Sequence, residues 1–383
     1  MLRLFNSLTR QKEAFVPSKS PVTMYVCGVT PYDTTHAGHA FTYVVFDVLH
    51  RYLRFLGYSV RYVSNITDVD DSILDRARQR KMDHHVLGKE QTAQFLKDMQ
   101  DLRVLPPDVR PKASDEVPDM VPIVQGLLER QAAYVVDGWV YFSVAAFPDY
   151  GQLGRLDREQ MAKLLAERGG DPNDRRKRDP LDFVLWQPSL DDEPRWPAPW
   201  GPGRPGWHLE CTAMALRYLD QSIDIHGGGA DLIYPHHESE IAQSELYTGT
   251  KPFARFWMHT GMVRLNGEKM SKSLGNLILV RDLLREHSAS AIRLYLLSHH
   301  YHEGWEFEVE AIGRCDELAR RIEAASASDG AHGAGEDPFF AALGDDLDTP
   351  RALALLTERL EQAEAGDDQA AQSLAAYRGL LGI

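Results

Sequence analysis

Hydrophobic and polar residues follow two different patterns in the first part of the chain, a continuous apolar run and then a helical repeat. The apolar run VTMYVCGV (22–29) predicts a buried strand. In residues 38–57, apolar side chains recur every three or four positions, which predicts an amphipathic helix that Gly57 ends. The stretch YSVRYVSNI (58–66) predicts the next strand. Strand, helix and strand form a βαβ unit, so we expect a parallel sheet whose ligands gather beyond the carboxyl ends of its strands.

The pattern changes further along the chain. Residues 76–204 are first helical and then rich in loops, and they end in the Pro-, Gly- and Trp-rich EPRWPAPWGPGRPGW, which indicates an insertion. A second strand is predicted at SIDIHGGG (222–229), and helical segments dominate from about residue 280. The low-complexity stretch AASASDGAHGAGED (324–337) is typical of a linker. We therefore predict a doubly wound α/β fold, interrupted by an insertion over 116–204 and followed by a helical region.

Composition narrows the class of protein. The 383 residues are 43% hydrophobic, which is enough for a substantial core in two or three structural units. No apolar run approaches the ~20 residues of a membrane span, and the first residues do not resemble a signal peptide, so we expect a cytoplasmic protein without a membrane partner. Only three cysteines occur, at positions 27, 211 and 315, which argues against a disulfide framework. The net charge of −14 gives no general attraction to nucleic acid.

The stretch YPHHESE (234–240) is too polar for ordinary core packing. If a helix starts after Pro235, His236 and Glu240 project from one face about one turn apart, a spacing suited to shared metal ligation. Cys27 and Cys211 would complete a tetrahedral zinc set, since zinc accepts S, N and O donors. Alternatively, the cysteines are buried apolar residues and the His–Glu pair caps a helix. The scattered spacing leaves both interpretations open.

Two further motifs favour phosphate chemistry. KMSKSLGN (269–276) places Lys269 and Lys272 among turn-forming residues, which predicts a mobile loop that carries two cations toward a polyphosphate. THAGHAF (35–41) places His36 and His39 at the start of the βαβ helix, where backbone amides and the helix dipole favour a phosphate. Taken singly, the first motif could be a solvated charge run and the second a pair of surface histidines.

Taken together, the two motifs resemble the HIGH and KMSKS signatures of class I aminoacyl-tRNA synthetases. Over roughly residues 1–310 the chain resembles the cysteinyl-tRNA synthetase group. The shared stretches are MYVCG, NITDVDD (65–71), KRDPLDFVLW (177–186), GRPGWHLEC (203–211), HGGGADLIYPHHESEIAQS (226–244) and KMSKSLGN. The resemblance implies a Rossmann-type parallel sheet in two halves, an insertion, a KMSKS region and a short acidic helical region. The two halves of the sheet domain are residues 1–115 and 205–262, and the insertion is 116–204. The KMSKS region is 263–310, and the acidic helical region is 311–383.

The resemblance also implies residue roles. One zinc ion per chain would be held by Cys27, Cys211, His236 and Glu240, and it would bind the thiolate of the substrate L-cysteine. Cysteine binding is implied for Cys27, Gly28, Thr67, Trp207 and His208, although the last three could equally be core residues. ATP, as its Mg²⁺ complex, would be bound and activated by His36, His39, Lys269 and Lys272. Adenosine would contact Gly227, Gly228, Gly229 and Asp231.

The acceptor of the activated cysteine is a separate question. A typical cysteinyl-tRNA synthetase continues into an anticodon-binding region where this chain ends, and residues 311–383 hold 6 Arg and no Lys against 14 Asp and Glu. The second His of THAGHA and the stretches ERGGDPNDRRKRDPLD (167–182) and HHYHEGWEF (299–307) resemble the ligase that joins cysteine to glucosaminyl-inositol in mycothiol synthesis. FNSLTRQKE and Glu240 resemble the tRNA enzymes instead.

We therefore predict a small amine acceptor, glucosaminyl-inositol, with tRNA-Cys as the alternative acceptor and a monomeric enzyme in either case. A third hypothesis is a zinc-containing binding module without catalytic activity, against which the intact histidine and lysine motifs argue.

Overall fold

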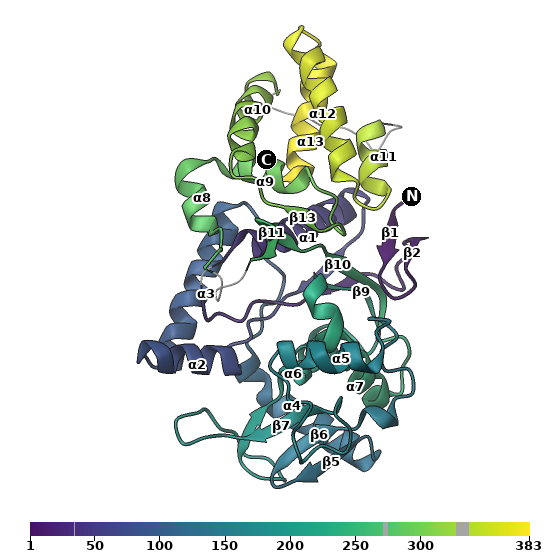
Figure 1. Cartoon of the computed structure of the whole chain (residues 1–383). Coiled ribbons are helices and arrows are strands. Elements are labelled where there is room, and N and C mark those ends of the chain that lie inside the picture. The colour runs from purple at the N-terminus through teal and green to yellow at the C-terminus, as the bar shows by residue number, and fades with distance from the viewer. Residues whose placement is uncertain (34, 271–274, 327–336) are drawn as a thin grey trace.

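The computed structural model describes residues 1–33, 35–270, 275–326 and 337–383 (Figure 1). A central sheet with α1 occupies the middle of the molecule in Figure 1, the insertion lies below it, and the C-terminal helices lie above it. Among the described residues, no helix combines the length and the apolar character that crossing a membrane requires.

The central sheet consists of four parallel strands in the order β10-β9-β3-β4. Their bounds are β3 (Val22–Val26), β4 (Val60–Val63), β9 (Ile223–Gly229) and β10 (Ala254–Thr260). All residues of β3 are buried, as expected for a parallel strand covered on both faces. The predicted βαβ unit and the predicted strand at 222–229 are therefore confirmed, with ends shifted by a few residues.

Helix α1 (Ala37–Phe55) connects β3 to β4 and lies against the sheet. Gly57 follows its end with a φ of +87°, in agreement with the predicted stop. Phe46 of α1 lies so close to β9 that a Cβ on Gly227 would be 2.1 Å from the ring. The close packing fixes the start of α1, where His36 and His39 lie, at the carboxyl edge of the sheet.

The region between β4 and β9 combines helices with a second sheet, which is antiparallel and has the order β5-β6-β7-β8. The prediction that residues 76–204 are helical and then loop-rich is wrong about this sheet. The sequence did contain a signal, because Asp137-Gly138 separates two apolar stretches and this dipeptide is typical of tight hairpins. The elements are α2 (Asp71–Arg80), α3 (His84–Asp101), α4 (Ala113–Glu129), β5 (Ala133–Val136), β6 (Trp139–Phe142), a 3₁₀ turn (Val144–Ala146), α5 (Arg158–Glu167), β7 (Phe183–Pro188), β8 (Gly203–Pro205) and α6 (Trp207–Tyr218).

After β9 the chain turns back through a 3₁₀ turn (Ala230–Leu232) and a π-helical turn (Ile233–His237) into α7 (Glu238–Thr248). Helices dominate after residue 280, as predicted: α8 (Val280–Glu286), α9 (Ala289–Leu297), α10 (Ala311–Ala325), α11 (Pro338–Gly344), α12 (Thr349–Glu364) and α13 (Asp368–Leu381). Short strands complete the fold: β1 (Arg3–Asn6), β2 (Gln11–Ala14), β11 (Val263–Leu265), β12 (Glu268–Lys269) and β13 (Trp305–Glu306). The predicted linker at 324–337 lies mostly outside the described residues.

The C-terminal helices pack against α1 through a shared core. Buried residues of α11, α12 and α13 belong to the same hydrophobic cluster as those of α1. At its centre, the fully buried Arg293 of α9 donates from Nη2 to Asp47 Oδ2 of α1 at 2.5 Å. Its Nε donates to the carbonyl of Leu381 at 2.8 Å and its Nη1 to the carbonyl of Leu102 at 3.1 Å. One buried cation therefore joins α1, the end of α3 and the end of α13.

Candidate active site

A cavity of about 830 Å³ opens where the parallel strands of the central sheet end. This is the position at which ligands collect in open α/β sheets. Many residues that the sequence singled out line it: Cys27, Gly28, His36, His39, Thr67, Trp207, Cys211, Gly229, Asp231 and His236. These residues come from segments far apart in the chain, and the parallel sheet brings them to one edge.

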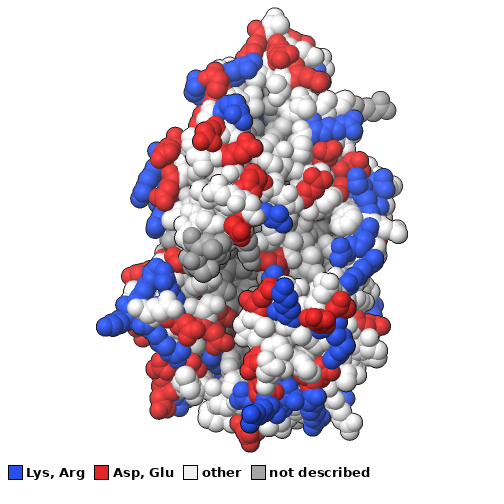
Figure 2. Space-filling model, viewed as in Figure 1, with Lys and Arg blue, Asp and Glu red and all other residues white. Residues whose placement is uncertain are grey.

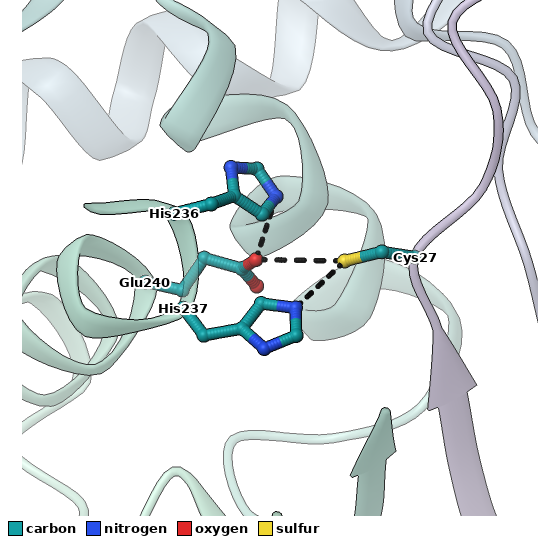
Figure 3. A group of neighbouring side chains, drawn as sticks. All are labelled: Cys27, His236, His237 and Glu240. Atoms are coloured by element: carbon teal, nitrogen blue, oxygen red, sulfur yellow. Dashed lines mark hydrogen bonds and ion pairs between the residues drawn. The ribbon is translucent and has the colours of Figure 1, made fainter. Parts of the chain in front are cut away.

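At one wall of the cavity, Cys27 and His236 belong to a group of four potential metal ligands that also includes His237 and Glu240 (Figure 3). Their ligand atoms all lie within 4.8 Å of one another, and all four residues are buried. Cys27 Sγ lies 3.2 Å from His237 Nε2 and 3.7 Å from Glu240 Oε1. His237 is a member that the sequence analysis missed, although its position beside His236 was a visible signal.

The fourth predicted zinc ligand, Cys211, borders this group, because its Sγ lies 3.7 Å from Cys27 Sγ. Two sulfurs bound to one tetrahedral zinc at about 2.3 Å are separated by about 3.8 Å. His236 Nε2 lies 2.9 Å from Glu240 Oε1, close enough for both atoms to reach one ion. The sulfur, nitrogen and oxygen donors and their separations therefore fit zinc.

Local structure explains this convergence. Cys27 is the first residue after β3, and Cys211 lies on the first turns of α6. The π-helical turn passes directly into α7, so His236 and Glu240 are one turn apart on one face, as predicted from their i, i+4 spacing.

A second layer of histidines orients the ligands. His226 Nε2 lies 2.8 Å from Glu240 Oε2. His237 Nδ1 lies 2.8 Å from His259 Nε2, and His259 Nδ1 lies 2.8 Å from the hydroxyl of Ser7. Such outer partners fix the orientation of ligating side chains and are typical of metal sites.

The electrostatics of the group favour the anionic forms of Glu240 and Cys211, whereas burial and the neighbouring Cys211 and Glu240 raise the pKa of Cys27. Burial opposes ionisation of Glu240, but His226 and His236 lower its pKa to about 2. Burial also opposes the Cys211 thiolate, yet a hydrogen bond from Cys27 and the nearby His236 lower its pKa to about 6. The cluster thus offers a carboxylate and a thiolate near neutral pH, and these are the protonation states that bind a divalent metal.

The two histidines of THAGHAF lie together at the start of α1. His36 is the N-cap residue, and its Nδ1 accepts a hydrogen bond from the backbone N–H of Gly38 at 3.1 Å. The rings of His36 and His39 stack with their centres 3.9 Å apart, and both line the cavity. Of the KMSKS lysines, Lys269 belongs to β12, whereas Lys272 lies outside the described residues.

The glycines of HGGGAD differ in their environments. Gly229 and Asp231 line the cavity, whereas Gly227 and Gly228 pack against Phe46 and Leu232. Arg168, which the sequence analysis did not single out, also lines the cavity and donates to the backbone carbonyl of Asp231. Its Nη1 lies 4.0 Å from Asp231 Oδ2. Arg168 thus joins the insertion to the segment that follows β9.

The predicted cysteine-binding residues separate into two groups. Gly28, Thr67 and Trp207 line the cavity, and the Trp207 ring stacks on His236 with centres 4.2 Å apart. His208 is buried and its Nδ1 lies 3.1 Å from His236 Nδ1, so it supports a potential ligand and is not part of the cavity lining among the described residues.

Replacement of Gly28 by alanine tests the tight packing beside the cluster. A Cβ at this position would lie 1.6 Å from the carbonyl oxygen of Asn65, so the backbone of one segment must move. We expect Gly28→Ala to lower the free energy of unfolding by about 1–3 kcal/mol, as overpacking does, and to raise the KM for cysteine. Urea denaturation and a cysteine titration measure the two effects. Gly313→Ala is the control, because nothing lies within 4 Å of a Cβ there; equal effects of the two substitutions would contradict this interpretation.

Comparisons with known proteins agree with this architecture. A family model for the tRNA synthetases class I (C) catalytic domain matches residues 14–317. A cysteine–tRNA ligase from Aquifex aeolicus is 44% identical over 374 residues, 92% of this chain and 74% of that protein. One from Syntrophobacter fumaroxidans is 45% identical over 98% of this chain and 76% of its own length. The L-cysteine:1D-myo-inositol 2-amino-2-deoxy-alpha-D-glucopyranoside ligase of Acidothermus cellulolyticus is 45% identical over 99% of this chain and 94% of its own length.

Solved structures share the fold. Methionyl-tRNA synthetase from Mycobacterium tuberculosis, in complex with methionyl-adenylate, aligns with a TM-score of 0.62 over 95% of this chain and 82% of that chain. The sequences are 17% identical in that alignment.

Proposed function

Because this chain belongs to the catalytic-domain family of class I (C) tRNA synthetases, we propose that it is an ATP-dependent, AMP-forming ligase that activates L-cysteine. The main observation that supports this proposal is that two groups of residues line the same cavity. One group is Cys27, Cys211 and His236, and the other is the His36–His39 pair. The first set suits a metal that binds a thiol, and the second suits a phosphate at a helix start.

In the first step, a carboxylate oxygen of cysteine attacks the α-phosphorus of ATP. The new O–P bond gives cysteinyl-adenylate, and the bond to the departing pyrophosphate breaks. His36 and His39 donate hydrogen bonds to the α-phosphate as charge develops there, and Lys269 and Lys272 neutralise the pyrophosphate. Asp231 binds the ribose hydroxyls, while Gly229 lets the adenosine approach the backbone.

We assign the selection of cysteine over serine to the buried group of potential metal ligands. When bound, zinc supplies a soft Lewis acid for the side-chain thiolate of the substrate, which the harder, weakly acidic hydroxyl of serine does not match. Cys27, Cys211, His236 and Glu240 would hold the ion. His226 orients Glu240, and His237, which is itself held by His259, lies against Cys27. Thr67 and Trp207 enclose the substrate beside this group.

For the second step we propose tRNA-Cys as the acceptor. The sequence analysis placed the amino sugar first, but the comparisons favour the tRNA, because the similar proteins are mostly cysteine–tRNA ligases. A ribose hydroxyl of the terminal nucleotide attacks the cysteinyl carbonyl carbon, an ester bond forms, and AMP leaves as the anhydride bond breaks. The hydroxyl proton is released to solvent.

An amino sugar is the second candidate, and a specific observation favours it. Both stretches that resemble the glucosaminyl-inositol ligase contact the cavity or its wall. Arg168, from the first stretch, lines the cavity. In the second stretch, the carbonyl of Tyr301 accepts a hydrogen bond from Gly261 N at 2.7 Å, and Trp305 N donates to the carbonyl of Met262 at 3.1 Å. Gly261 and Met262 both line the cavity. An amine would give an amide, AMP and one released proton.

One experiment separates the acceptors. Enzyme, ATP and labelled cysteine are supplied with either tRNA-Cys transcript or glucosaminyl-inositol at the same salt concentration, since binding of nucleic acid depends strongly on salt. We expect labelled tRNA and cysteine-dependent pyrophosphate exchange. An amide product without charged tRNA would replace the first acceptor by the second. Absence of exchange with either acceptor would contradict cysteine activation itself.

A further inference from the structure

We propose that one face of α2, made of Ser72, Asp75, Arg76 and Gln79, is the subsite that binds the hydroxyl-rich body of the acceptor. This inference rests on the proposed function, because it assigns the part of the cavity that neither cysteine nor ATP uses. The four residues all line the cavity. They are spaced as i, i+3, i+4 and i+7, so one face of the helix presents all of them.

The position of this face follows from the chain path. Thr67 lines the cavity beside the cysteine-binding residues, and only a short segment separates it from Asp70, the N-cap residue of α2. With a rise of about 1.5 Å per residue, Ser72 and Gln79 are about 10 Å apart along the helix axis. The face therefore gives the cavity a polar wall about as long as two linked sugar rings. Figure 1 shows α2 at the outer edge of the molecule, beside α3.

The side chains on this face form a polar array. Arg76 donates from Nη1 to Gln79 Oε1 and from Nη2 to Asp33 Oδ2, both at 3.2 Å. Its Nε has no hydrogen-bond partner among the described residues. Asp33 also lines the cavity, and Asp75 is 64% exposed. The array thus presents guanidinium donors next to carboxylate acceptors.

Such an array matches neighbouring hydroxyl groups, because each hydroxyl donates one hydrogen bond and accepts others. Carboxylates accept from the hydroxyls, and the guanidinium donates to them. Asp75 also pairs with Arg78 at 3.1 Å, and Asp33 also lies 3.6 Å from Arg80, so carboxylates and guanidinium groups alternate along this part of the cavity. Figure 2 shows acidic and basic side chains intermixed around the central hollow. The terminal ribose of a tRNA and an amino sugar share the required hydroxyl groups.

The test uses full-length Gln79→Ala and Arg76→Met and compares three nucleophiles for the enzyme-bound adenylate. Hydroxylamine lacks a hydroxyl-rich body and gives cysteine hydroxamate without needing the subsite. The other two are tRNA-Cys transcript and glucosaminyl-inositol.

We expect the kcat/KM for the natural acceptor that the wild type uses to fall about tenfold in Gln79→Ala, because one neutral hydrogen bond is lost. It should fall further in Arg76→Met, because the lost hydrogen bonds are charged. Pyrophosphate exchange and hydroxamate formation stay near wild type. Gln100→Ala, an exposed glutamine of α3, is the matched control.

The outcomes are distinguishable. An unchanged ratio of natural-acceptor transfer to hydroxamate formation in both variants would overturn the subsite, as would a wild type that prefers neither natural acceptor to hydroxylamine. Loss of exchange in both variants, with Gln100→Ala normal, would also overturn it, because α2 would then serve the adenylate. Loss of exchange and hydroxamate in the wild type would instead refute cysteine activation. If only transfer to tRNA-Cys is lost, the subsite binds the ribose hydroxyls of a tRNA; if only transfer to glucosaminyl-inositol is lost, it binds the hydroxyls of an amino sugar.

Discussion

Cys27→Ser and Cys211→Ser are each expected to lose the bound zinc and, with it, cysteine-dependent pyrophosphate exchange. The two sulfurs lie 3.7 Å apart in a buried group, and a serine hydroxyl does not supply a thiolate. Loss of an outer partner in a metal site costs about 10–100-fold in affinity or activity, so loss of a direct ligand should reduce exchange by about 100-fold or more. Metal analysis of the purified protein and an exchange assay with saturating ATP measure the two losses.

The third cysteine provides the matched control. Cys315 lies on α10, in a separate small pocket with Arg314 and Leu318, and outside the ligand group. Cys315→Ser should keep both zinc and exchange. If Cys27→Ser and Cys211→Ser retained metal and full exchange, the ligand assignment would be refuted. His237→Gln then distinguishes a ligand from an orienting residue: loss of zinc equal to that of Cys27→Ser would place His237 among the ligands.

Arg293→Met is expected to lower the free energy of unfolding by about 3–5 kcal/mol, the range for removing one member of a buried ion pair. The substitution leaves Asp47 fully buried, with Arg51 as its remaining ion-pair partner at 2.9 Å. It also removes the donors of two buried hydrogen bonds, to Leu102 and Leu381. Because these contacts join α1 to α13, the C-terminal helices should separate from the catalytic core at lower urea concentration.

Urea denaturation, followed by circular dichroism, measures this change. Arg285→Met is the control, since Arg285 is 73% exposed and pairs only with Asp282 on its own helix among the described residues. We expect its effect to stay within about 0.5 kcal/mol. Equal urea midpoints for the two variants would mean that the buried cation contributes little to the docking of the C-terminal helices.

The sequence by itself predicted the central βαβ unit, which the structure confirms, and the residues to which we assign the chemistry. The strand at 22–29 is a continuous apolar run because its side chains are buried on both faces, whereas the helix at 38–57 has a helical repeat because it buries one face. The motifs around His36, Cys211 and His236 are local in sequence, but each alone left a purely structural interpretation open. The prediction of phosphate and metal chemistry came from the motifs taken together and from the family resemblance that they carry. The i, i+4 relation of His236 to Glu240 also followed from helix geometry alone.

Other features depended on the tertiary structure. The sequence analysis missed the antiparallel sheet of the insertion. Its strands are short, and pairing with segments distant in the sequence stabilises them in addition to their local hydrophobic pattern. His237, Arg168 and the polar face of α2 became apparent as parts of the site only in three dimensions, where His237 lies beside Cys27 and Arg168 reaches Asp231. Contacts between residues distant in sequence leave no local periodic signal, so packing of the parallel sheet, the insertion and α2 around one cavity decided which side chains meet there.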